Sequence, residues 1–122
     1  MASVLAVNGH AQAFLAAVQF QIDVRRERGG VRLRPIGEVD ISTIEQVKAA
    51  LDEAVAAGVS HVILDLRETT FLDSSGLHFA VDTHTWAQAT RTEFSIIAGP
   101  PAVQRTFEVA NLRDLLPFVD VP

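Results

Sequence analysis

The sequence contains no cysteine, a single lysine and no long apolar run, and each of these absences narrows what the protein can be. Without cysteine it forms neither disulfides nor thiolate metal sites, and it has no cysteine nucleophile. Its formal net charge of -5 and its one lysine, Lys48, argue against a surface that neutralises the phosphates of nucleic acid. No apolar stretch approaches the roughly 20 residues that a membrane-spanning helix needs.

Residues 1–17 are apolar and alanine-rich but lack the basic start of a secretory signal peptide. Their composition is compatible with a short helix or with a disordered leader. The 122 residues suffice for one hydrophobic core and are too few for two domains. We therefore expect a cytoplasmic protein with a leader over residues 1–17 and one folded domain over residues 18–122.

Common catalytic and ligand-binding motifs are also absent. No Gly-x-Ser-x-Gly elbow presents a serine nucleophile, and no Gly-x-x-x-x-Gly-Lys-Ser/Thr loop binds nucleotide phosphates. The four histidines include no pair at i, i+4 that could join a third ligand around a metal ion. We therefore expect neither a metal nor a cofactor.

The chain is organised around an apolar strand followed by a polar helix start. Residues 62–66 (Val-Ile-Leu-Asp-Leu) form a short run without alternation, which is typical of a strand buried on both faces. Asp73-Ser74-Ser75-Gly76 then precedes a helical pattern, and such residues satisfy the unpaired amides of a helix N-terminus. Two serine hydroxyls thus lie at the positive end of a helix, where added negative charge is stabilised. Their simplest role is to cap the helix.

The flanking patterns predict a hairpin and then alternating helices and strands. Apolar residues alternate over residues 20–24 and 31–36, with a Gly-Gly turn between, which indicates an antiparallel hairpin. The order that follows predicts an α/β fold, a mixed sheet of about four to five strands flanked by helices, with parallel crossovers. The expected helices cover residues 44–57, about 75–89 and 101 onward; the expected strands cover residues 61–66, 93–98 and, as a final turn or short strand, 115–119.

Several local features carry more specific expectations. Ser42 or Asp40 is expected to cap the first helix, and Glu45 stands at the capping-box distance from Ser42. Pro35 weakens strand pairing, which indicates an edge strand or a bulge. The arginines of the hairpin are expected to lie on solvated strand faces rather than to form a nucleic-acid patch. They are Arg25, Arg26, Arg28, Arg32 and Arg34.

Three motifs together resemble the STAS domain family, in particular the bacterial anti-sigma factor antagonists. Residues 71–77 (Phe-Leu-Asp-Ser-Ser-Gly-Leu) are similar to the family's phosphorylation motif, an apolar pair followed by Asp-Ser-Ser/Thr-Gly-Leu. Residues 37–40 (Gly-Glu-Val-Asp) resemble a second signature. Residues 101–107 (Pro-Ala-Val-Gln-Arg-Thr-Phe) resemble a third, at the start of the last helix. With the trailing Asn111-Leu112, the resemblance covers roughly residues 18–120.

The resemblance implies a regulator of transcription that is not an enzyme and acts by partner switching. Unphosphorylated, such a protein binds an anti-sigma factor that is also a serine kinase, and a sigma factor is released. Phosphorylation of the serine that corresponds to Ser74 abolishes binding, and a PP2C-type phosphatase reverses it. The resemblance also implies that Asp40, Asp73, Ser75 and Gly76 surround the phosphorylated serine on the surface that the partner contacts, and Ser75 is the expected cap. We expect a monomer or weak dimer that binds neither nucleic acid nor membranes.

Three alternatives are compatible with parts of the sequence. A related STAS domain serves as a scaffold or regulatory subunit of a stress-sensing assembly or a membrane transporter, but the intact Asp-Ser-Ser-Gly favours the antagonist. An enzyme with Ser74 as nucleophile needs a base, for which His78, at a position often occupied by glycine in the antagonists, is a candidate. A receiver domain phosphorylated on Asp65 is disfavoured, because Lys48 lies in the first helix and no acidic pair follows the first strand. Asp65 is instead expected to point toward a helix cap or solvent.

Overall fold

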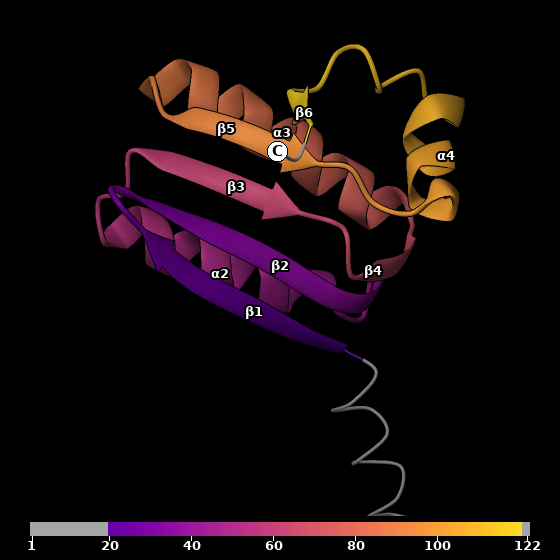
Figure 1. Cartoon of the computed structure of the whole chain (residues 1–122), viewed down its shortest axis with the longest axis horizontal. Helices are drawn as coiled ribbons and strands as arrows, with labels where there is room; N and C mark the ends of the chain where they lie inside the picture. The colour runs from indigo at the N-terminus through magenta and orange to yellow at the C-terminus, as the bar shows by residue number, and fades with distance from the viewer. Residues whose placement is uncertain (1–19, 121–122) are drawn as a thin grey trace, which may run out of the picture.

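A computed structural model describes residues 20–120, which form a six-stranded mixed sheet and three helices (Figure 1). The strand order is β1-β2-β3-β5-β6, and β4 pairs with β2. None of the helices in this part of the chain has both the length and the apolar character needed to cross a membrane. In chain order the elements are β1 (Phe20–Glu27), β2 (Gly30–Val39), α2 (Ile44–Ala56), β3 (His61–Asp65), β4 (Thr69–Leu72), α3 (Ser74–Thr90), β5 (Glu93–Ile97), α4 (Pro101–Val109) and β6 (Phe118–Val119).

The predicted α/β class is confirmed. Strands β1 and β2 form the expected antiparallel hairpin, and Gly29 takes a φ of 71° in its turn, a conformation that glycine adopts without strain. Strands β2, β3 and β5 are mutually parallel, joined by α2 and α3. Both helices lie behind the sheet in Figure 1, so they cover the same face. The leader expected over residues 1–17 lies outside the described residues, and the domain boundary at residue 18 stays a prediction.

The hydrophobic core lies where the sheet meets α2 and α3. Alternate residues of β2, β3 and β5 are buried, as the two-residue period of a strand requires. Phe107 of α4 is fully buried and packs edge-on against Phe118 of β6, with ring centroids 5.1 Å apart. The most deeply buried strand residues of this core are Val31, Leu33, Val62 and Ile96.

Strand β4 was not expected from the sequence, and it brings the sheet to six strands. Its pattern is buried, exposed, exposed, buried, so the alternation that indicates a strand is missing. It is held by parallel pairing with β2, which places Thr69 opposite Gly37 and Leu72 opposite Val39. This strand determines where the following helix, α3, begins.

Pro35 does not lie in an edge strand, because β2 has neighbours on both sides. It lies where β2 changes partner: pairing with β3 runs to Leu33, and pairing with β4 starts at Gly37. A register shift follows between Gly37 and Glu38, so the alternative expectation of a bulge is met two residues further on. The carbonyl of Pro35 accepts a hydrogen bond from the hydroxyl of Thr69 at 3.0 Å.

Candidate functional site

The Asp-Ser-Ser-Gly motif lies at the edge of the sheet where β2 and β4 end. Val39 and Leu72 are opposite one another in the register, and the Asp73 amide donates to the Val39 carbonyl at 3.1 Å. Asp40 directly follows β2 and Asp73 directly follows β4, so the two residues leave the sheet as neighbours. The structure thus brings together two segments that are far apart in the sequence.

Asp73, rather than Ser75, caps α3. Its carboxylate accepts the amide hydrogen of Ser75 at 2.8 Å, and its carbonyl accepts those of Gly76 and Leu77 at 3.1 Å each. The expectation that Ser75 would cap the helix is therefore wrong. Asp and Ser are comparable capping residues, and Asp73 comes directly before the first helical residue, where a cap must stand.

Ser74 is the first residue of α3 and is exposed, whereas Ser75 is half-buried. The three amides that follow Ser74 in the first turn already donate to Asp73. A phosphate on Ser74 would be favoured by the helix dipole but would stand next to the Asp73 carboxylate. The geometry therefore suits a hydroxyl that another protein modifies and contacts from outside.

Asp40 organises the loop beside the motif instead of capping α2. Its carboxylate accepts hydrogen bonds from the amide and the hydroxyl of Ser42 at 2.9 and 2.6 Å. The Ser42 hydroxyl bond is the main reason that the pKa of the Asp40 carboxyl lies below its ordinary value. Thr43 occupies the cap position without a side-chain cap bond, so the capping box expected from Ser42 and Glu45 does not form.

Two large apolar side chains are exposed in the segments next to the motif. Ile41, directly after Asp40, is 80% exposed, and Phe71, two residues before Asp73, is 50% exposed. Together with Ser75 and His78, Ile41 lines a cavity of about 190 Å³. Exposed apolar side chains that gather beside polar loops are typical of protein interaction surfaces.

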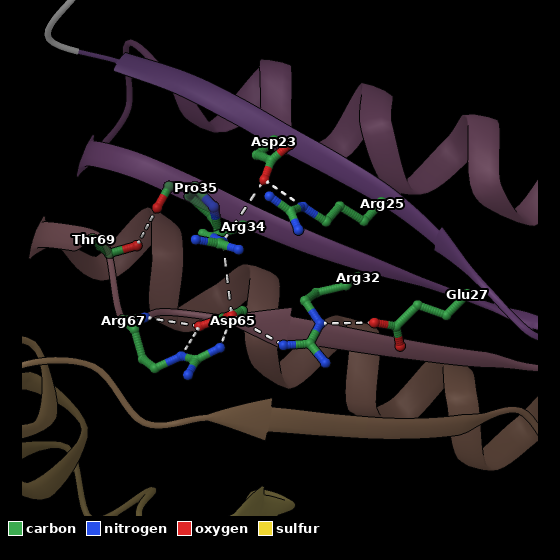
Figure 2. Close-up of polar contacts among 9 residues, drawn as sticks. All are labelled: Asp23, Arg25, Glu27, Arg32, Arg34, Pro35, Asp65, Arg67 and Thr69. Carbon is green, nitrogen blue, oxygen red and sulfur yellow. Dashed lines mark hydrogen bonds and ion pairs between the residues drawn. The ribbon is translucent and has the colours of Figure 1, made fainter. Parts of the chain in front are cut away.

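Asp65 is fully buried at the end of β3, so the expectation that it points to a helix cap or solvent is wrong. Figure 2 shows its carboxylate between three arginines. Arg67 binds both oxygens, Nε to Oδ1 at 3.0 Å and Nη2 to Oδ2 at 2.7 Å. Arg32 and Arg34 approach Oδ2 at 3.5 and 3.8 Å. These two arginines therefore belong to a charge network and are not merely solvated.

Arg67 and Arg34 keep the Asp65 carboxyl ionised. Burial alone would raise the pKa of its carboxyl, but the hydrogen bonds and charge of Arg67, with the charge of Arg34, hold the pKa below its ordinary value. The same interaction raises the pKa of Arg67. The carboxylate is thus ionised inside the protein, and it balances part of the positive charge around it.

The Asp65 cluster also fixes the connection that leads to Ser74. Asp65 Oδ1 accepts the amide hydrogen of Arg67 at 3.1 Å, which shapes the turn after β3. On the other side of this turn the Thr69 hydroxyl binds the carbonyl of Pro35 in β2. The turn that precedes β4 is therefore held by Asp65 of β3, the start of β4 is attached to β2, and β4 in turn places the motif.

Replacing Gly76 by alanine is expected to destabilise the protein although alanine favours helices. A Cβ at this position would lie 2.5 Å from Cγ of Leu72, which is only 3% exposed. Overpacking of about 1–3 kcal/mol outweighs the roughly 1 kcal/mol gained from helix propensity. We expect urea denaturation to show a lower free energy of unfolding than for Gln88→Ala, an exposed position on the same helix. Equal stability of the two variants would contradict this.

Comparisons with known proteins agree with the fold. The family model for the STAS domain matches residues 21–121. An anti-sigma F factor antagonist from Paenibacillus polymyxa is 28% identical over 104 residues, 84% of this chain and 89% of the relative. An anti-sigma-B factor antagonist from Staphylococcus aureus is 26% identical over 80 residues, 66% of this chain and 74% of the relative. The crystal structure of an anti-sigma factor antagonist from Mycobacterium paratuberculosis gives a TM-score of 0.72 at 25% identity, covering 81% of this chain and 84% of that one.

Proposed function

The chain belongs to the STAS domain family, and we propose that it is an anti-sigma factor antagonist that regulates transcription by partner switching. Unphosphorylated, it binds an anti-sigma factor that is also a serine kinase, and a sigma factor is released. Phosphorylation of Ser74 by this kinase ends the binding, and a PP2C-type phosphatase restores it. In this cytoplasmic cycle the protein is a ligand and a substrate rather than an enzyme.

The observation that carries the proposal is the position of Ser74. Its side chain is exposed at the first position of α3, in the motif Asp-Ser-Ser-Gly, beside the loop that Asp40 organises. Exposed Ile41 and Phe71 lie in the two adjoining segments and supply apolar contact area. A kinase can reach this hydroxyl without any rearrangement of the domain.

The chemistry of the transfer belongs to the partner. The Ser74 oxygen forms a bond to the γ-phosphorus of ATP as the bond to ADP breaks, and a base on the kinase takes the hydroxyl proton. Such transfers depend on positioning and on metal ions that neutralise the phosphates, both of which kinases provide. The role of this chain is to present Ser74 on a rigid helix start.

The charge of the phosphate accounts for the release. Phosphorylation adds about -1.5 to -2 charges at neutral pH. At the N-terminus of α3 that charge is tolerated within the domain. Inside an interface it stands next to Asp73 and close to the Asp40 loop, so both like-charge repulsion and desolvation oppose binding. The modification can therefore end an interaction without unfolding the domain.

A paired pulldown from the source cells tests the proposal. The Ser74→Ala bait is expected to retain a small ATP-binding kinase that Ser74→Glu, a partial phosphate mimic, does not retain. Thr85→Ala is the matched control, because it removes an exposed hydroxyl of α3 outside the motif, and it should behave like the unmodified protein. Incubation of the unmodified protein with the recovered kinase and ATP should place the phosphate on Ser74, as resolved by fragmentation of the tryptic phosphopeptide.

Two results would contradict the proposal. A phosphate found on Ser75 alone would show that the switch is Ser75 and not Ser74. Retention of one large assembly or a transporter by both Ser74 baits would show that Ser74 is not the switch, and would support the scaffold or regulatory-subunit alternative.

A further inference from the structure

A groove between α2 and α3 leads away from the phosphorylation motif. It consists of two adjoining cavities of about 190 and 250 Å³, which share Lys48, Phe79 and Asp82 as lining residues. The first cavity reaches Ser75, next to the motif, and the second reaches Trp86. Along α3 the groove therefore extends about three helical turns, or roughly 16 Å at 1.5 Å per residue.

The cavity that reaches Trp86 is mainly apolar, whereas the cavity next to the motif is about equally polar and apolar. Leu51 of α2 and Trp86 of α3 are only partly buried and pack against the core, and Ile41 is exposed at the end nearest the motif. Trp86 is the single tryptophan of the chain. Tryptophan is enriched among residues that dominate binding energy, and a groove between two helices is a common seat for an amphipathic helix.

The rim of the groove is acidic. Glu45, Asp52 and Asp82 are exposed along it, and the one cationic side chain among the lining residues, Lys48, lies 3.4 Å from the Glu45 carboxylate. Neither α2 nor α3 contains an arginine, whereas five arginines lie in the segment from β1 to β2. The helical face is thus complementary to a positively charged partner.

We propose that this groove docks a basic amphipathic helix of the anti-sigma kinase. The proposal rests on the proposed function, and it adds a second contact on the same partner, continuous with the motif through Ser75. The basic side chains of the helix face the acidic rim, and its apolar side covers Leu51 and Trp86. Part of the affinity then comes from a surface that phosphorylation does not alter.

Charge reversal on the rim tests the docking site. In the Ser74→Ala background, Asp52→Lys with Asp82→Lys is expected to raise the Kd for the kinase at least tenfold, because attraction becomes repulsion. The salt dependence of the association rate should weaken or reverse. The matched control is Glu93→Lys with Asp114→Lys, which makes the same change in net charge at exposed positions outside the groove. It should stay within twofold of the background, and circular dichroism should show that both variants are folded.

A second measurement reports on the groove directly. Since Trp86 is the only tryptophan of the chain, 5-fluorotryptophan gives a single fluorine resonance, which should shift when unlabelled kinase is added. A kinase that binds Ser74→Ala but leaves this resonance and the affinity of the rim variant unchanged would overturn the docking site and leave the proposed function intact. Failure of any kinase to bind Ser74→Ala would overturn both. A shift with increasing concentration of the protein alone would assign the groove to a second copy and overturn the proposal.

Discussion

Replacing Asp65 by alanine is expected to lower the free energy of unfolding by about 3–5 kcal/mol, which is the usual cost of removing one partner from a buried ion pair. The carboxylate is fully buried, and Arg67, Arg32 and Arg34 all lie within 3.8 Å of it. Alanine leaves these guanidinium groups facing one another without a counter-charge. It also removes the acceptor that shapes the turn before β4.

Urea denaturation at neutral pH measures this loss. Asp52→Ala is the matched control, because it removes an aspartate that is exposed on the surface. It should change the free energy of unfolding by less than about 0.5 kcal/mol. Asp65→Asn keeps the shape of the side chain but not its charge, and it should fall between the two. A loss below 1 kcal/mol for Asp65→Ala would show that the arginines repack without the carboxylate.

The pKa of Asp65 adds a pH dependence with a definite sign. Because the pKa is lowered in the folded protein, ionisation of Asp65 contributes stability above the unfolded value of about 3.9. That contribution disappears as the pH falls through the folded value. The stability difference between the unmodified protein and Asp65→Asn should therefore be constant from pH 7 to about pH 5 and shrink below about pH 4. A difference that grows on acidification would contradict the lowered pKa.

The parts of the fold that sequence analysis predicted are those defined by local patterns. The helical spacing of Ile44, Val47 and Leu51 predicts α2, and the structure begins that helix at Ile44. The apolar run at residues 62–66 is likewise a local pattern, and it predicts β3. In contrast, β4 depends on parallel pairing with β2, whose residues lie about 30 positions earlier, and nothing in its own four residues indicates a strand.

The same distinction applies to the charged residues. The residues next to Asp65 in the sequence indicate a cap or solvent, because they do not show the cations that surround it. Arg32 and Arg34 reach Asp65 only through the register between β2 and β3. The sequence predicts a cap for α3 but not which residue provides it, because several capping residues stand in a row and Asp73 is only one of them. The motif alone predicts Ser74 as the phosphorylated residue, whereas the approach of the Asp40 loop to the motif follows from the pairing of Val39 with Leu72.

Phosphoserine at position 74 is expected to weaken binding to the anti-sigma kinase by 100-fold or more, because like charges brought together in an interface cost several kcal/mol. The stability of the isolated domain should change by less than about 1 kcal/mol, since a negative charge at the first residue of a helix is favoured by its dipole. Asp73 offsets part of this gain, because it already accepts the amides of the first turn. A large loss of binding with little change in stability would mean that the switch acts at the interface and not through the fold.

Genetically encoded phosphoserine allows this prediction to be measured with a control in the same helix. Position 88 is exposed in the last turn of α3, at the negative end of the helix dipole. Phosphoserine in place of Gln88 should therefore lower stability by about 0.3–1 kcal/mol and leave kinase binding within twofold. Calorimetric titration and urea denaturation of the two proteins then separate charge at the interface from charge on the helix. If the phosphate at position 74 unfolds the domain, release acts through the fold and not at the interface. If both positions weaken binding equally, release does not depend on where the phosphate lies.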